Sequence, residues 1–197
     1  FLPSSGSYTY GDNTGGELDA AREYHKAACN HNTITKNLKD IDIKNSLGKY
    51  LTSSSSENLD LVVGENPSYP DLTHRRAVWM VDRTFFVIAD AVYGSSAGST
   101  INLNFHLCRD TNGPLGVNAV AIDDYSSACA YGAHTVFTDG NNVVFKSFSD
   151  TAAGFKGENG TSYWSDKIGE RQTRKYYRIN VTKKDASSTP RFRRARS

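Results

Sequence analysis

His31 has a side chain and a position in the sequence that favour metal binding or proton transfer. It lies in the run Cys29-Asn30-His31-Asn32-Thr33-Ile34-Thr35, where a segment of small residues passes into alternating apolar and polar residues. A neutral imidazole at the start of a strand can bind a metal ion through one nitrogen while a second group holds the other nitrogen, or it can transfer protons. Zinc takes three or four protein ligands, so a lone histidine in this position is more often a structural residue.

Two further groups of side chains could bind a ligand. Tyr8 and Tyr10 stand at alternate positions after a glycine-containing turn, where either they contact a ligand or they pack at the start of a strand. Arg75 and Arg76 could bind sulfate or carboxylate groups with their guanidinium groups, or they could be exposed residues on a sheet face. Because side chains alternate along a strand, we expect only one of the two arginines to face any cleft.

The remaining histidines are predicted to be structural or exposed. His25 lies six residues before His31, too far for one helical face at a spacing of four, and is interpreted as a surface residue. His106 and His134 fall within predicted strands, and both are interpreted as structural.

The composition predicts an all-β fold. The 197 residues include 16 Gly, 11 Tyr and 9 Phe but a single Met, which is typical of strands and turns. Strands are predicted over residues 59–63, 74–81, 84–93, 99–107, 134–138, 142–148 and 176–181. Two pairs form hairpins, one separated by Asp82-Arg83 and the other by an Asp-Gly turn at residues 139–141. We therefore expect an antiparallel β-sandwich of two large sheets, as a single domain over residues 1–190.

Three segments depart from this strand pattern. Residues 17–29 are predicted to form a short helix or an irregular segment, with acidic residues early and Lys26 late. Residues 52–57 and 152–166 are predicted to be surface loops, because the first is rich in serine and the second in glycine. In the strand over residues 99–107, one face is apolar and the other carries Asn102, Asn104 and His106.

Charge and cysteine content limit the classes of partner. The net charge is only +2, and four arginines fall within residues 191–197, a basic tail that we interpret as disordered or foreign to the domain. Without a basic stripe on the body, nucleic-acid binding is not expected. No apolar run approaches the roughly 20 residues that cross a bilayer, so no membrane partner is expected. The three cysteines have no metal-site spacing, and one disulfide could form.

The order of several motifs resembles one known family, the C-terminal β-sheet domain of heparinase II/III-like polysaccharide lyases. No single motif is specific, but their order and spacing together cover nearly the whole chain. They are Leu2-Pro3-Ser4-Ser5-Gly6-Ser7-Tyr8-Thr9-Tyr10, His31-Asn32-Thr33, His74-Arg75-Arg76, Val81-Asp82, Val87-Ile88-Ala89-Asp90 and Tyr163-Trp164-Ser165.

The resemblance implies one part of a two-part enzyme. In such lyases an N-terminal α/α toroid and a C-terminal β-sandwich bind an acidic, uronate-containing polysaccharide, such as heparin, heparan sulfate or alginate, and cleave it by β-elimination. In such enzymes a Tyr and a His or Asn of the toroid act together with a His of the sheet domain. No catalytic residue is assigned in this chain, which lacks the full acid and base set and alone would be inactive. Tyr8, Tyr10, Arg75 and Arg76 would contact substrate. Enzymes of this kind are usually periplasmic or secreted.

The resemblance also implies a metal ligand. The family's sheet domain commonly binds zinc through the second histidine of a His-x-His motif, an aspartate and the histidine of a His-Asn-Thr motif. His31 matches the last of these ligands. Ser4 stands at the aspartate position and brings no charge to a cation, and the His-x-His motif would precede Phe1. The zinc site is therefore expected to be incomplete in this chain.

A second class of function remains open. The chain could be a non-catalytic carbohydrate-binding or structural β-sandwich, since its tyrosines together with Trp79 and Trp164 offer aromatic faces on which sugar rings stack.

Overall fold

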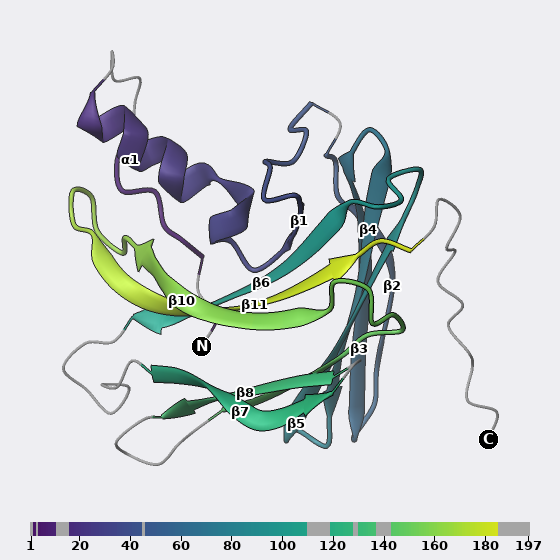
Figure 1. Ribbon diagram of the computed structural model, residues 1–197. Coiled ribbons are helices and arrows are strands. Elements are labelled where there is room, and N and C mark those ends of the chain that lie inside the picture. Colours follow the sequence, from purple (N-terminus) through teal and green to yellow (C-terminus); the bar gives the residue numbers. More distant parts are fainter. Residues whose placement is uncertain are drawn as a thin grey trace, which may run out of the picture. The chain divides into compact units, whose positions relative to one another are not determined.

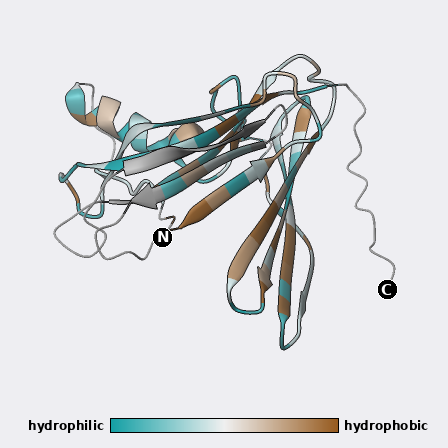
Figure 2. Ribbon diagram, turned by 60° about the horizontal axis from the view of Figure 1, so that its bottom comes forward, coloured by the Kyte–Doolittle hydropathy of each residue, from teal (hydrophilic) through white to brown (hydrophobic). Residues whose placement is uncertain are grey.

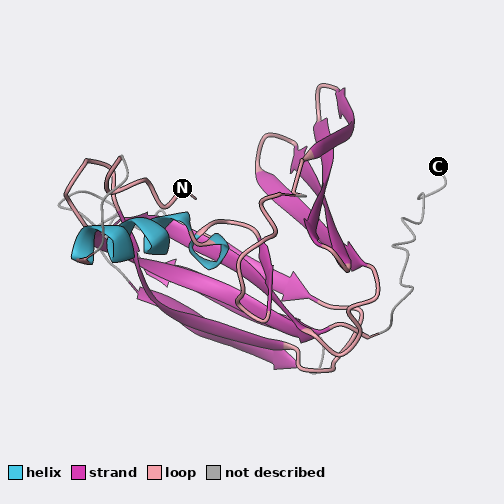
Figure 3. Cartoon of the chain, turned by 90° about the horizontal axis from the view of Figure 1, so that it is seen from above, coloured by secondary structure: helices cyan, strands magenta, loops and turns pink. Residues whose placement is uncertain are grey.

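The structure of this chain is a computed structural model, and it describes residues 2, 4–10, 16–44, 46–109, 119–127, 130–136 and 143–184. Strands dominate the described chain (Figure 3). The contacts divide the chain into two compact units, and the single domain over residues 1–190 stays a prediction. Among the described residues, unit 1 combines those up to Asp40 with those of Thr100–Thr182, and unit 2 contains those of Ile41–Ser99 with Lys183 and Lys184. The basic tail at residues 191–197 lies outside the described residues.

Unit 1 contains the two layers of a β-sandwich, and every strand pair in it is antiparallel. The first sheet has the order β1-β6-β11-β10. The second has the order β7-β8-β9. The bounds are β1 Ile34–Lys36, β6 Thr100–Arg109, β10 Lys156–Trp164 and β11 Gln172–Thr182 in the first sheet, and β7 Ala119–Ser127, β8 Ala130–Val136 and β9 Val144–Phe148 in the second. The prediction of an antiparallel β-sandwich is confirmed.

The core of unit 1 lies between these two sheets. Phe145 of β9 packs against Phe105 of β6 and Tyr177 of β11, with ring centroids 6.0 and 5.6 Å apart. Burial of such rings supplies most of the favourable free energy that holds the layers together. The buried cluster consists of Phe105, Leu107, Ala133, Phe155, Tyr177 and Ile179.

The opposite face of the first sheet is covered by helical structure (Figure 1). Helix α1 spans Glu17–Lys26 and is followed by a short 3-10 helix, η1, over Ala28–Asn30. Acidic residues in the first turn of α1 and basic residues in its last turn suit the helix dipole, as predicted. This covering buries the polar face of β6, where Asn104 and His106 are both 0% exposed.

Unit 2 contains a third sheet, an antiparallel meander in the order β2-β3-β4-β5. The bounds are β2 Lys49–Ser55, β3 Leu59–Tyr69, β4 Leu72–Val81 and β5 Phe85–Tyr93. The predicted hairpin of β4 and β5 is confirmed. Asp82 and Arg83 both have positive φ, and the Thr84 N–H donates to the Val81 carbonyl at 2.9 Å, a geometry typical of a type I′ turn. Hydropathy along the strands is drawn in Figure 2.

Both predicted loops are wrong, because each contains a strand. The serine-rich segment forms the edge strand β2, whose exposed side chains need no apolar alternation. The glycine-rich segment forms β10, where the glycines allow close approach. A Cβ at Gly160 would lie 2.7 Å from the Tyr176 ring, and one at Gly157 would lie 3.0 Å from the Tyr131 ring.

Candidate functional site

His31 is held between helix α1 and the N-terminal segment. Its Nε2 lies 2.9 Å from the His25 carbonyl oxygen. A carbonyl oxygen only accepts, so Nε2 carries the hydrogen and Nδ1 presents its lone pair to the Ser4 hydroxyl at 3.3 Å. Burial lowers the pKa of His31, and the nearby Arg174 charge lowers it further. The imidazole is therefore neutral, with one nitrogen available to a hydrogen-bond donor or a cation.

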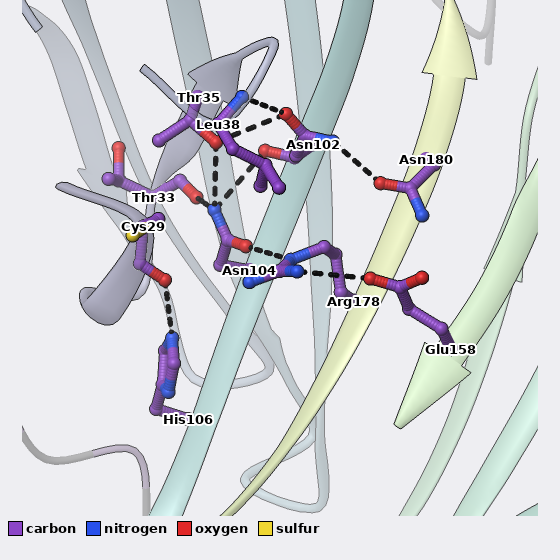
Figure 4. A network of polar contacts seen from close by, with 10 residues as sticks. All are labelled: Cys29, Thr33, Thr35, Leu38, Asn102, Asn104, His106, Glu158, Arg178 and Asn180. Carbon is purple, nitrogen blue, oxygen red and sulfur yellow. Dashed lines mark hydrogen bonds and ion pairs between the residues drawn. The ribbon is translucent and has the colours of Figure 1, made fainter. Parts of the chain in front are cut away.

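A buried polar network positions the segment that carries His31 (Figure 4). Asn104 of β6 donates to the Thr33 carbonyl at 3.0 Å and accepts from Nε of Arg178 at 2.6 Å. Arg178 in turn pairs with Glu158 at 3.0 Å. His106 donates from Nε2 to the Cys29 carbonyl at 2.8 Å. These bonds anchor both ends of the segment from residue 29 to residue 33 on the sheet.

His25 was predicted to lie on the surface, and that prediction is wrong. Its side chain is 1% exposed, because it lies between α1 and the N-terminal segment rather than toward solvent. Nδ1 lies 2.9 Å from both oxygens of Ser5, and the ring stacks on Tyr8 with centroids 5.8 Å apart and planes at 5°. Burial lowers the pKa of His25, and Arg171 and Arg174 lower it further. His25 therefore joins the residues predicted from the sequence, Tyr8 and His31.

The two predicted tyrosines differ in their surroundings. Tyr8 has a positive φ of 58°, its ring is half-buried against His25, and its carbonyl accepts from the Gly169 N–H at 2.8 Å. Tyr10 is 72% exposed. Tyr8 is thus part of the packed site, and Tyr10 offers its ring to solvent.

Four more residues of the site, Tyr24, Tyr163, Arg171 and Arg174, were not assigned to it by the sequence analysis. Tyr24 of α1 and Tyr163 of β10 meet edge to face with ring centroids 5.5 Å apart, and the Tyr163 N–H donates to the Tyr24 hydroxyl at 3.1 Å. The Arg171 guanidinium lies over both rings, 3.9 Å from the Tyr163 centroid and 5.0 Å from that of Tyr24. The adjacency of Tyr24 to His25 on the helix was the available signal. Nothing in the sequence placed Arg171 over these rings.

A buried guanidinium completes the site. Arg174 is 2% exposed and donates to the Asn30 carbonyl at 2.8 Å and to the Ser4 carbonyl at 3.4 Å. Burial lowers the pKa of Arg174 to about 10, so it stays charged at neutral pH. We call these residues together the N-terminal cluster: Ser4, Tyr8, Tyr24, His25, His31, Tyr163, Arg171 and Arg174. Its two guanidinium groups give it a positive character.

The described residues do not fit a complete zinc site. The group facing His31 Nδ1 is a serine hydroxyl, which is a poor zinc ligand. Within the described residues, no group of three or more His, Cys, Asp or Glu side chains could hold a metal ion. The Arg174 charge also disfavours a cation beside His31. The N-terminal cluster thus supplies one imidazole ligand and an environment better suited to an anion.

Arg75 and Arg76 belong to unit 2, and they point to opposite faces of its sheet, as alternation predicted. Arg75 pairs with Glu65 at 2.6 Å, and the Tyr93 hydroxyl also hydrogen-bonds to Glu65. Arg76 pairs with Asp90 at 2.7 Å. The structure therefore gathers Tyr8 and His31 into one cluster, while each arginine is held by a carboxylate within its own sheet.

His74 shares the carboxylate of Asp90 with Arg76. Its Nε2 lies 2.5 Å from Asp90 Oδ1, and both side chains are largely buried. Burial raises the pKa of Asp90, but His74 and Arg76 lower it by more, so the net shift is downward.

Comparison with known proteins covers nearly the whole chain. The family profile described as "Heparinase II/III-like, C-terminal" matches residues 1–193. A heparin-sulfate lyase from Bacteroides stercoris is 34% identical over 197 residues, which cover 97% of this chain and 26% of that protein. A heparin-sulfate lyase from Bacteroides thetaiotaomicron is 35% identical over 195 residues, covering 98% and 25%.

Solved structures give the same correspondence. A crystal structure of heparinase III is 33% identical, with a TM-score of 0.75 over 93% of this chain and 26% of that one. The chain thus spans about a quarter of the length of the relatives it matches. In the part of the chain that the structure describes, no helix has the length and apolar character needed to span a membrane.

Proposed function

The chain belongs to the heparinase II/III-like C-terminal domain family, and we propose from this that it forms the β-sandwich part of a polysaccharide lyase. The proposed substrate is an acidic, uronate-containing polysaccharide, a glycosaminoglycan of the heparin or heparan sulfate type or an alginate-like polymer. In the proposed β-elimination, a base removes the proton at C5 of the uronate and an acid protonates the leaving oxygen, which produces an unsaturated sugar.

The observation that carries this proposal beyond family membership is the positive character of the N-terminal cluster. Abstraction of the C5 proton requires that the uronate carboxylate be neutralised, and preorganised cations do this well in a partly desolvated site. Arg171 lies over the rings of Tyr24 and Tyr163, and Arg174 donates to the carbonyl oxygens of Asn30 and Ser4.

The substrate contacts of this chain are proposed on the same basis. Tyr10 is exposed and Tyr8 is a half-buried member of the cluster, so each can pack a ring against sugar C–H groups. Arg75 and Arg76 are proposed as further contacts with sulfate or carboxylate groups. The carboxylates of Glu65 and Asp90 offset part of their charge, so we assign these arginines a smaller share of the binding.

We propose that the isolated chain is inactive, because part of the acid and base set of the reaction would be supplied by an N-terminal α/α toroid. The test is an ultraviolet absorbance assay for the unsaturated product, with heparan sulfate and alginate as substrates. We expect no product from the 197-residue chain and product from a longer protein that also carries the toroid. Product from the chain alone would contradict the assignment of the catalytic groups to the toroid.

The alternative is a non-catalytic carbohydrate-binding or structural module, supported by the exposed ring of Tyr10. Calorimetry with heparan sulfate oligosaccharides, followed by the product assay on the longer protein, separates the two functions. Binding without cleavage by the longer protein would favour the alternative.

We also propose a metal-binding role for one residue of this chain. His31 is the residue of this chain that would contribute a zinc ligand through Nδ1, with the remaining ligands supplied from outside the described residues. Metal analysis of the purified chain tests this, and we expect less than one zinc per chain.

We propose a periplasmic or secreted location, because polysaccharides of this kind are extracellular. Cell fractionation tests this location.

A further inference from the structure

Arg171 holds a fixed position on the surface of unit 1. Its guanidinium carbon lies 3.9 Å from the centroid of the Tyr163 ring, within van der Waals contact. Tyr163 is itself fixed, since its N–H bonds to the Tyr24 hydroxyl and its ring meets the Tyr24 ring edge to face. Stacking of this kind holds a guanidinium in one plane and leaves its N–H groups directed outward.

The hydrogen-bond donors of Arg171 are available to a ligand. Among the described residues the structure gives Arg171 ring contacts with Tyr24 and Tyr163 and neither a hydrogen bond nor an ion pair. The carboxylate next to it in the sequence, Glu170, is paired with Lys167 at 3.7 Å. A guanidinium carries five donors, and here they face solvent already oriented. Preorganised donors lose little conformational entropy when they bind an anion.

Arg171 is also connected to the proposed substrate contacts. The turn that precedes it donates from the Gly169 N–H to the Tyr8 carbonyl at 2.8 Å. The Ser165 N–H donates to the Ser5 carbonyl at 3.0 Å, so the N-terminal segment and the turn before Arg171 lie side by side. An anion bound at Arg171 would therefore lie within the surface formed by the N-terminal cluster.

We propose that Arg171, stacked on Tyr163, binds a carboxylate or sulfate group of the acidic polysaccharide through a bidentate hydrogen-bonded ion pair. This inference rests on the proposed function and assigns it a specific residue. Oxyanions of both kinds match the fork of guanidinium donors, whereas a lysine ammonium offers a point charge without that geometry.

The test is calorimetric titration of the 197-residue chain with heparan sulfate oligosaccharides. We expect R171Q to raise Kd about 10-fold or more, as for loss of a charged hydrogen bond, and R171K to recover only part of the affinity. Y163A should weaken binding in the same direction, because it removes the ring that positions the guanidinium. R83Q is the matched control, since Arg83 is an exposed arginine paired with Asp60 in unit 2. Thermal unfolding of each variant verifies that it is folded.

Two further ligands separate the sources of the oxyanion. An unsulfated uronate polymer tests the carboxylate, and a sulfated neutral glucan tests the sulfate. The increase in Kd caused by R171Q should be seen with the polymer that carries the group bound by Arg171, whether carboxylate or sulfate. If the wild-type chain binds oligosaccharide and R171Q binds equally well, the inference is wrong while the proposed function stands. If the wild-type chain binds none of the three ligands, the inference and the proposed substrate contacts of this chain are wrong, and the product assay on the longer protein decides the proposed function separately.

Discussion

Asn104 receives a 2.6 Å hydrogen bond from Arg178 Nε and donates a 3.0 Å hydrogen bond to the Thr33 carbonyl, so one amide joins strand β11 to the segment that carries His31. The side chain is fully buried. Its two partners come from elements far apart in the sequence. This amide therefore orders the N-terminal cluster from beneath while lying outside it.

We expect Asn104→Ala to lower the free energy of unfolding by about 2–4 kcal/mol, because it leaves Arg178 Nε without this acceptor and removes the side-chain donor to the Thr33 carbonyl, which keeps only the backbone N–H of residue 104. Urea denaturation measures the change. Asn58→Ala, at an exposed position, is the control and should change stability by less than about 0.5 kcal/mol. A loss at Asn104 no larger than that at Asn58 would show that the network is not structural.

The same network fixes the charge state of His106. The imidazole is fully buried, and burial, followed by the charge of Arg174, lowers its pKa from 6.5 to about 3. The unfolded chain binds a proton below pH 6.5 that the folded chain does not accept until about pH 3. The contribution to stability is thus fully present above pH 6.5 and is lost as pH falls toward 3.

In this window the free energy of unfolding should fall by up to about 1.4 kcal/mol per pH unit from His106 alone. We expect His106→Asn to flatten the curve of stability against pH between pH 6.5 and 4, measured by urea denaturation at each pH. His134→Asn, at a half-buried histidine of β8, is the matched control and should leave the slope closer to that of the wild-type chain. Equal slopes for all three proteins would contradict the lowered pKa of His106.

The strands and the polar stripe of β6 could be predicted because both follow from alternation. Ile101, Leu103, Phe105 and Leu107 alternate with polar residues, and the sequence placed the two sets on opposite faces correctly. It could not show that the polar face is buried, because the cover comes from α1 and η1, more than 70 residues earlier in the chain. Burial of Asn104 and His106 is a tertiary result, and alternation alone carries no information about it.

The candidate site was predicted only in part for a similar reason. His31 and Tyr8 were identified from local motifs. His25 was assigned to the surface because it lies six residues before His31, too far for the two side chains to share one helical face. In the structure His25 contacts His31 through its backbone carbonyl, at 2.9 Å. Arg171 lies 147 positions from Tyr24 in the sequence. The pairing of β10 with β11 brings Arg171 to Tyr163, and the contact of Tyr163 with Tyr24 brings it to the ring on α1.

Asp90 should matter more to stability than a surface carboxylate. It accepts from His74 at 2.5 Å and from Arg76 at 2.7 Å, and its side chain is 11% exposed. Asp90→Asn replaces the carboxylate that accepts from both donors with a neutral amide. We expect the free energy of unfolding to fall by about 2–3 kcal/mol, and the loss is limited because Arg76 can turn partly to solvent. Asp60→Asn, which breaks the more exposed pair with Arg83, should cost less than about 1 kcal/mol. Thermal or urea unfolding distinguishes the two, and equal losses would contradict the buried role of Asp90.

Gly160 is required by the Tyr176 ring rather than by a turn. A Cβ at this position would lie 2.7 Å from Cζ and the hydroxyl oxygen of Tyr176. That ring also lies 5.7 Å from the His106 ring and 4.7 Å from the Arg178 guanidinium, which restricts its movement. We therefore expect Gly160→Ala to lower the free energy of unfolding by about 1–3 kcal/mol, the usual cost of overpacking.

Gly48→Ala is the matched control for this substitution, because no atom lies within 4 Å of the Cβ it would add. It should be neutral or slightly stabilising, since alanine loses less backbone entropy on folding than glycine. Urea denaturation of both variants gives the comparison. In the double variant Gly160→Ala/Tyr176→Ala the steric conflict is absent, so the cost of the added methyl group should disappear relative to Tyr176→Ala alone. If that cost persists, the constraint on Gly160 lies in the backbone of β10 and not in the Tyr176 ring.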